Sequence, residues 1–137
     1  MLTELQEKSC AKLNLTLDVL APRGDGYHDL RMVMQTVSLH DDVTVLVREN
    51  GPWRVYGTGL PVPENQGNLA WKAAEVYFAG APQRPGLEIR IDKRIPSQAG
   101  LAGGSADAAA VLRALNRQFG LYVPEQLAEL ALQVGSD

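Results

Sequence analysis

The segment from residue 93 to residue 116 constrains the fold more than any other part of this 137-residue chain. Before it, apolar residues alternate with charged ones over residues 87–92, which is the pattern of a half-buried strand. After it, apolar residues recur over residues 108–119 at the spacing of one helix face. The connection between them consists of small residues and ends in Gly103, Gly104 and Ser105. The sequence therefore predicts a strand, a glycine-rich loop and a helix that begins at these glycines.

Such a loop presents free backbone N–H groups and the positive end of a helix dipole, a combination that binds phosphate. Glycine lets the anion approach the backbone, because a side chain would hold it away. The loop is neither a P-loop, since no lysine follows the glycines, nor the dinucleotide-binding fingerprint, whose glycine spacing differs. A tight turn capped by Ser105 would explain the same residues, and the pattern alone does not separate the two interpretations. Asp107 would repel a phosphate, so we expect it to point away from any ligand.

Residues 95–109 resemble the phosphate loop of the superfamily of galactokinase, homoserine kinase, mevalonate kinase and phosphomevalonate kinase, whose pattern is Pro-x-x-x-Gly-Leu-Gly-x-Ser-Ser-Ala. The extra glycine and the following Asp-Ala-Ala resemble the branch that phosphorylates 4-diphosphocytidyl-2-C-methyl-D-erythritol for isoprenoid precursor synthesis. The chain departs from the pattern at Ala99, Ala102 and Ala106. By this resemblance Ser105 contacts Mg2+, and ATP binds along Pro96, Ser97, Gln98, Ala99, Gly100, Leu101, Ala102, Gly103, Gly104, Ser105 and Ala106.

Residues 9–20 alternate between apolar and polar side chains, which predicts a strand with one face in the core. Lys12 and Asn14 then project side by side from the polar face. An isolated lysine at such a position is most simply a solvated strand residue. However, Ala11-Lys12-Leu13-Asn14-Leu15 resembles the first motif of the same kinase branch. The resemblance implies that Lys12 lies beside the substrate hydroxyl and the phosphates, with Asn14 hydrogen-bonding nearby.

Tyr27 and His28 follow a glycine-rich turn and allow three interpretations. They could pack at a strand entrance, or His28 could bind a metal, although no suitable set of ligands accompanies it. A third interpretation is recognition of a nucleobase, with Tyr27 stacking and His28 forming a hydrogen bond. Asp-Gly-Tyr-His resembles the element that contacts cytosine in the same branch, which favours the third interpretation and implies a cytidine diphosphate substrate. Relatives that act on sugars, homoserine or mevalonate have no cytosine to recognise.

Three further residues are candidates for the site. Asn68 is expected to cap a helix that Gly80 ends, and Asn68-Leu69 also resembles the family's Asn-Leu near the adenosine. Lys93 closes its strand beside the loop, where a cation could contact the nucleotide, although a lysine at a strand end is usually solvated. After a helix from Pro124 to Gly135, Gly-Ser-Asp resembles the element that carries the catalytic carboxylate, which implies that Asp137 is catalytic. In the family a second half follows, so we expect residues 1–137 to be an ATP-binding N-terminal domain that is inactive alone.

The composition excludes several classes of function. A net charge of −3, a pI near 5.4 and the lack of a basic run argue against a nucleic-acid partner. No apolar run approaches the roughly 18 residues of a membrane span, and the first residues lack a signal peptide's apolar core. Cys10 is the single cysteine, so no internal disulfide is possible and a cytoplasmic location is expected. Nothing in the sequence indicates an oligomeric state.

These patterns predict an α+β fold with strands at residues 3–20, 28–38, 42–48, 53–57 and 87–93, a turn at Asp41-Asp42, and three helices on one face of a mixed sheet. The resemblance implies a two-layer sandwich like that of ribosomal protein S5. The expected function is ATP-dependent phosphorylation of an alcohol group. Two alternatives remain: a related kinase for homoserine or mevalonate, and a non-catalytic binding module with the same fold.

Overall fold

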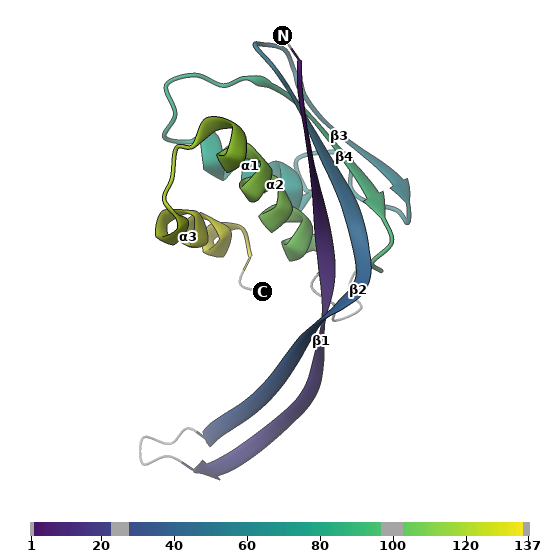
Figure 1. Ribbon diagram of the computed structural model, residues 1–137, viewed down its shortest axis with the longest axis vertical. Helices are drawn as coiled ribbons and strands as arrows, with labels where there is room; N and C mark the ends of the chain where they lie inside the picture. Colours follow the sequence, from purple (N-terminus) through teal and green to yellow (C-terminus); the bar gives the residue numbers. More distant parts are fainter. Residues whose placement is uncertain (1, 23–27, 97–102, 136–137) are drawn as a thin grey trace.

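The computed structural model describes residues 2–22, 28–96 and 103–135, and within these ranges the side chains of all residues except 12–38. Four strands and three helices alternate as expected for an α+β fold (Figure 1). Their bounds are β1 (Thr3–Pro22), β2 (His28–Arg48), β3 (Trp53–Gly59), α1 (Leu69–Phe78), β4 (Gly86–Lys93), α2 (Gly103–Phe119) and α3 (Pro124–Val134).

The strands form one mixed sheet in the order β1-β2-β4-β3. Strand β3 runs parallel to β4, and the other neighbouring strands are antiparallel. Helix α1 connects the parallel pair, as the long crossover between parallel strands requires. All three helices lie on the same face of the sheet, and α3 lies outermost (Figure 1). The predicted two-layer arrangement is therefore confirmed.

The predicted turn at Asp41-Asp42 is wrong, because β2 continues through both residues. Asp41 is fully buried and shares the helix-facing side of the strand with Val43, Val45 and Val47. Adjacent aspartates usually indicate a turn because burying a carboxylate is costly. Here hydrogen bonds from β4 and the segment after it compensate that cost, so the strand does not need to end.

Strands β1 and β2 are long enough to form an arm that extends beyond the rest of the sheet (Figure 1). Their pairing shifts register between Cys10 and Lys12, where Cys10 lies opposite His40 but Lys12 lies opposite Thr36. The extra residues of β2 at this bulge increase the local twist and bend, as bulges do. The arm, residues 12–22 with 28–36, therefore leaves the sheet directly after Ala11.

The core lies between the sheet and the helices. Valine, leucine and isoleucine side chains of β2 and β4 meet small residues of α1 and α2, which let these helices approach closely. Six aromatic side chains continue this core toward the far end of the helices, with ring centroids 5.0–6.5 Å apart: Trp53, Trp71, Tyr77, Phe78, Phe119 and Tyr122. Within the described part of the chain, none of the helices combines the length and apolarity that crossing a membrane would demand.

Candidate functional site

The end of β4 and the starts of α1 and α2 converge on one region of the molecule. A Cβ atom added at Gly103, the first residue of α2, would lie 2.8 Å from Ile95 Cγ2 and 2.9 Å from Lys93 Nζ. A Cβ atom at Gly104 would lie 3.2 Å from Leu69 Cδ1 of α1. These contacts show that the first turn of α2 fits between β4 and α1 because its glycines have no side chains.

The segment after α3 reaches the same region. A Cβ atom at Gly135 would lie 2.9 Å from Ser105 Oγ in the first turn of α2. Residue 135 is thus brought against residue 105, although 30 positions separate them along the chain. The structure therefore brings the backbone just before Asp137 to the glycine-opened helix.

The start of α2 has the features of an anion-binding site. Gly104 is exposed and Ser105 is half-buried, and the first helical turn carries no acidic side chain. The N–H groups of this turn have no partner within the helix, which makes a helix N-terminus attractive to phosphate. Because Gly104 has no side chain, the backbone of this first turn is also exposed. The exposed N–H groups at the start of α2 suit the phosphates of a nucleoside triphosphate. The Ser105 hydroxyl is a side-chain oxygen in the same turn that could contact the divalent cation.

Beneath this helix start, Lys93 forms a buried ion-pair cluster with two aspartates. Its Nζ donates hydrogen bonds to Asp41 Oδ2 at 2.8 Å and to Asp107 Oδ2 at 2.9 Å. The three residues are at most 3% exposed. Asp107 points toward the protein interior, as expected for a carboxylate that should not face a phosphate.

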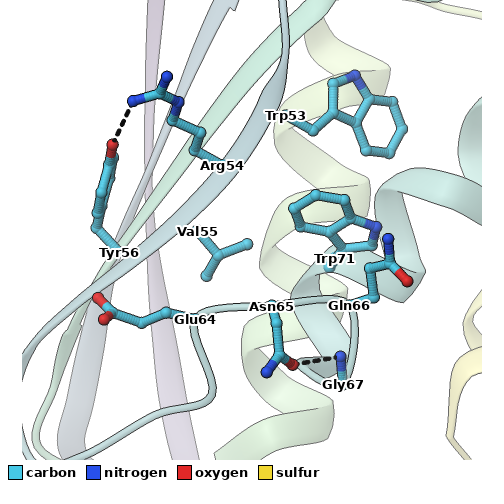
Figure 2. Close-up of a pocket in the computed structure, with 9 residues that line it drawn as sticks. All are labelled: Trp53, Arg54, Val55, Tyr56, Glu64, Asn65, Gln66, Gly67 and Trp71. Atoms are coloured by element: carbon cyan, nitrogen blue, oxygen red, sulfur yellow. Dashed lines mark hydrogen bonds between the residues drawn. The ribbon is translucent and has the colours of Figure 1, made fainter.

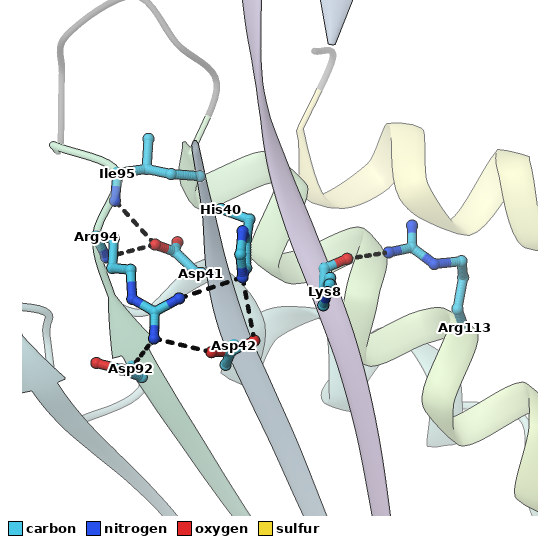
Figure 3. A network of polar contacts seen from close by, with 8 residues as sticks. All are labelled: Lys8, His40, Asp41, Asp42, Asp92, Arg94, Ile95 and Arg113. Atoms are coloured by element: carbon cyan, nitrogen blue, oxygen red, sulfur yellow. Dashed lines mark hydrogen bonds and ion pairs between the residues drawn. The ribbon is translucent and has the colours of Figure 1, made fainter. Parts of the chain in front are cut away.

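Asp41 also holds the backbone where β4 ends. Its Oδ1 accepts hydrogen bonds from the N–H groups of Arg94, at 2.7 Å, and Ile95, at 2.9 Å (Figure 3). The Arg94 side chain turns outward to Asp42 and Asp92, with N–O distances of 3.1 and 2.9 Å. The inner network is therefore buried, and the outer one is exposed to solvent.

Burial and hydrogen bonding shift the pKa values of the cluster in different directions. Burial raises the pKa of Asp107 to about 7, and its interaction with Asp41 adds to this effect while Lys93 opposes it. Burial also acts to raise the pKa of Asp41, but hydrogen bonds from Asp107, Lys93 and two backbone N–H groups outweigh it, so this pKa is lowered. Burial acts to lower the pKa of Lys93, and its two aspartate partners reverse this and raise it.

Lys12 and Asn14 lie in β1 just beyond the bulge, opposite Thr36 and Met34. The strand residues before them run beside α2, because Arg113 Nε donates to Glu7 Oε1 at 2.8 Å and Arg113 also contacts the carbonyl oxygen of Lys8 (Figure 3). The backbone of Lys12 is therefore close in sequence to the part of β1 that contacts α2. Where the two side chains point is outside what the structure describes.

The other predicted site residues are placed less closely together or lie outside the described residues. His28 begins β2 opposite Pro22, at the outer end of the arm and away from α2 (Figure 1). Pro96 is exposed three residues after the end of β4, and Ala106 is half-buried in α2. Outside the described residues lie Tyr27, Ser97, Gln98, Ala99, Gly100, Leu101, Ala102 and Asp137.

Asn68 caps α1 as expected. Its Oδ1 accepts from the N–H of Ala70 at 2.9 Å, and its Nδ2 donates to the carbonyl oxygen of Pro63 at 2.8 Å. The direct contact of Lys93 with a nucleotide stays a prediction, but this lysine is not solvated at a strand end, since its ammonium group is bound by two carboxylates. Asp41 was not identified from the sequence as its partner. The signal was available in the apolar alternation of Val43, Val45 and Val47, which continues in phase to Asp41.

A separate pocket of about 700 Å³ lies along the free edge of β3 (Figure 2). Trp53 and Trp71 form its apolar wall, while Arg54, Tyr56 and Glu64 border it with polar groups. No residue of this pocket was predicted to be functional. Among the described residues, no three His, Cys, Asp or Glu side chains form a metal-binding group.

Comparison with known proteins assigns the chain to a family through a segment that contains the glycine-opened helix α2. Residues 68–137 match the model of the GHMP kinases N terminal domain, which covers α1, β4, α2 and α3. The chain belongs to the GHMP kinase family. Over 135 residues it is 44% identical to the 4-diphosphocytidyl-2-C-methyl-D-erythritol kinase of Geobacter sulfurreducens, covering 98% of this chain and 48% of the relative. It is also 46% identical over 138 residues to the kinase of the same name from Acetivibrio thermocellus, covering 95% and 46%.

Solved structures agree with this GHMP kinase assignment. A crystal structure of 4-(cytidine 5'-diphospho)-2C-methyl-D-erythritol kinase superposes with a TM-score of 0.77 at 39% identity, covering 97% of this chain and 47% of that one. Homoserine kinase from Cytophaga hutchinsonii shares the fold, with a TM-score of 0.72 at 18% identity. The chain spans about half the length of the curated relatives it matches.

Proposed function

We propose that the full-length protein containing this chain transfers the γ-phosphoryl group of ATP to the 2-hydroxyl of 4-diphosphocytidyl-2-C-methyl-D-erythritol, a step in isoprenoid precursor synthesis. The observation that carries this proposal is the convergence of the glycine-opened start of α2 with Gly135, two residues before Asp137. Two residues span at most about 7 Å, which supports the proposal that the Asp137 carboxylate and the helix N-terminus belong to one site. The relatives of that name, identical at 44–46% of aligned positions, support the choice of substrate.

In this mechanism the backbone around α2 binds the triphosphate. The N–H groups of Gly103, Gly104 and Ser105 stabilise its negative charge, and residues 96–102 and Ala106 complete the binding loop. Asn68 and Leu69 at the start of α1 border the adenosine. When Mg2+ is bound, it neutralises phosphate charge, and the Ser105 hydroxyl is the candidate protein ligand for it.

Two charged residues act on the acceptor hydroxyl. Its oxygen forms a bond to the γ-phosphorus while the bond to the bridging oxygen of ADP breaks, and its proton passes to the Asp137 carboxylate. Lys12 holds Asp137 ionised and stabilises the charge that develops on the oxygens. Asn14 hydrogen-bonds the substrate nearby, while Tyr27 stacks on the cytosine and His28 forms a hydrogen bond with it.

The proposal is tested by assaying ADP formation by the full-length protein. We expect turnover with 4-diphosphocytidyl-2-C-methyl-D-erythritol and not with homoserine or mevalonate. Lys12→Ala and Asp137→Ala should each lower kcat by about 100-fold or more, with little change in Tm, because each removes a group that acts on the transferred proton or phosphoryl charge. Lys8→Ala is the matched control, since Lys8 is an exposed lysine on the same strand.

Near-normal turnover in Lys12→Ala or Asp137→Ala would remove that residue from the mechanism. Turnover with homoserine or mevalonate instead would favour the related kinases. If saturating ATP fails to raise the Tm, by contrast, the chain is a binding module that kept the fold.

A further inference from the structure

The buried Lys93 cluster links three elements at the point where the proposed ATP site begins. Asp41 comes from β2, Lys93 from the end of β4, and Asp107 from α2. We propose that these three residues form an ionic latch that fixes the N-terminal turn of α2 against the end of β4, so that they are positioning residues for the nucleoside triphosphate. This inference rests on the proposed function, because it assigns a role within the same site.

The first half of the latch consists of the hydrogen bonds between Asp41 and the end of β4. Backbone pairing of β2 with β4 ends at Asp42 and Asp92, so the next residues of β4 have no neighbour in β2. The Asp41 side chain replaces that pairing, since it binds Lys93 Nζ and the N–H groups of Arg94 and Ile95. Charge-assisted hydrogen bonds of this kind are about twice as strong as neutral ones. On the β2 side, one carboxylate therefore holds the end of β4, while β3 pairs with Lys93 on the other side.

The second half is the connection from Lys93 to α2. Lys93 Nζ lies 2.9 Å from Asp107 Oδ2, and the position of a Cβ atom at Gly103 is also 2.9 Å from this nitrogen. The ammonium group thus lies directly under the first turn of the helix. Any shift of α2 along its axis would break the contact with Asp107 or bring the backbone onto the lysine. The latch therefore fixes the position of α2 along its own axis, relative to the end of β4.

Asp107 also borders β1 through a second buried polar group, the hydroxyl of Ser9. Asp107 Oδ1 and Ser9 Oγ are both buried and have no hydrogen-bond partner among the described residues. Ser9 is nevertheless close enough to influence the pKa of Asp107. The latch therefore borders the strand that carries Lys12 as well as the elements it joins.

Such precision matters because catalysis depends on the placement of the N–H groups. Replacing a buried ion pair by apolar residues often leaves stability unchanged, so stability alone does not explain three buried charges. A displacement of about 1 Å in a catalytic group, in contrast, can lower the rate by about 100-fold. Removing one member of the cluster leaves the other buried charges unpaired and lowers stability, so the role we infer has to be read from the kinetics of ATP in variants that still fold.

The experiment compares KM for ATP with KM for the alcohol substrate in the full-length protein. Asp41→Asn and Lys93→Met should each raise KM for ATP at least tenfold or lower kcat by a similar factor, while KM for the alcohol stays within twofold. Asp42→Asn is the control, because Asp42 is the neighbouring aspartate of β2 and belongs to the outer network, where it pairs with Arg94 and His40 and not with Lys93. It should leave both KM values within twofold.

A conservative variant separates positioning from simple packing. Asp107→Asn keeps the shape of the side chain and an oxygen that can accept from Lys93 Nζ, so its KM for ATP should be at least threefold lower than that of Asp107→Ala. If Lys93→Met does not fold, as judged by its thermal transition, Asp41→Asn decides, since its amide oxygen can still accept from Arg94 and Ile95.

The latch is overturned if folded Asp41→Asn keeps KM for ATP and kcat within twofold, or if KM for both substrates rises equally. In that case a wild-type enzyme that phosphorylates its alcohol still supports the proposed function. If the wild-type protein itself does not use ATP, the proposed function and the latch fail together.

Discussion

At the scale of single residues, Asp107 is expected to make the stability of the protein depend on pH near neutrality. Burial raises its pKa from 3.8 to about 7, so the folded state binds this proton more tightly than the unfolded chain does. Its contribution to the free energy of unfolding is therefore fully present below about pH 4 and is lost as the pH rises through about 7. The slope is at most about 1.4 kcal/mol per pH unit. The lowered pKa of Asp41 acts only at more acidic pH, where protonating Asp41 costs stability.

Urea denaturation of the full-length protein between pH 4 and 7 measures this dependence. Asp107→Asn should flatten the profile over this range, because the amide does not titrate. Glu129→Gln, which changes an exposed carboxylate of α3, should leave it as in the wild type. A wild-type profile without a decline over this range would contradict the raised pKa.

The roles of these residues could be predicted from the sequence only in part. The orientation of Asp107 followed from the repulsion between a carboxylate and a phosphate at a helix start. The partners of Lys93 did not, because Asp41 is 52 positions away and only the sheet register and the position of α2 bring three charges together. Local patterns carry no information about such long-range pairs.

At the scale of elements, the start of α2 should tolerate a methyl group at one glycine and not at the other. Gly103→Ala would place its Cβ atom 2.8 Å from Ile95 Cγ2 and 2.9 Å from Lys93 Nζ, both in buried side chains. We expect a loss of about 1–3 kcal/mol in the free energy of unfolding, as for other overpacked cores. This exceeds the gain of up to about 1 kcal/mol in helix propensity.

Gly104→Ala is the matched comparison. Its Cβ atom would meet only Leu69 Cδ1, at 3.2 Å, and the end of a leucine side chain can move by a few tenths of an ångström. The free energy of unfolding should then change by less than about 1 kcal/mol. Equal losses in both variants, measured by urea denaturation, would contradict the close packing at Gly103.

The elements themselves were predicted well where local signals are strong. The helices α1, α2 and α3 begin and end at the expected places. Their ends are marked by Asn68, Gly103, Gly120 and Pro124. Two predicted strands proved to be one, because a buried network at Asp41 removes the reason for a turn. The bulge beside Ala11 also had no sequence signal, since it depends on how β1 and β2 align.

At the scale of the whole molecule, the two ends of the proposed site are far apart. Eight residues of β2 separate Thr36, opposite Lys12, from His28, which is roughly 26 Å along an extended strand. Substitutions at such distances act independently as a rule. Tyr27→Ala and His28→Ala should therefore raise KM for the cytidine substrate about tenfold or more and leave KM for ATP within twofold.

Steady-state kinetics of the full-length protein with each substrate varied in turn provides the test. Tyr56→Ala removes an aromatic side chain on β3 and serves as the control, with both KM values unchanged. A parallel rise in KM for ATP, or no change for the cytidine substrate, would contradict base recognition by Tyr27 and His28.

The bulge directly before Lys12 places the base of the arm next to a residue that is proposed to act in phosphoryl transfer. A rotation of about 10° there would carry the outer end of the arm about 5 Å while moving Lys12 very little, since the displacement grows with the roughly 26 Å radius. In the proposed kinase, such a rotation would move the outer end of the arm relative to the cytosine and leave Lys12 beside the acceptor hydroxyl. Ala11 is fully buried beside the bulge. A larger side chain at this position would have to displace its neighbours and would change how the arm is held.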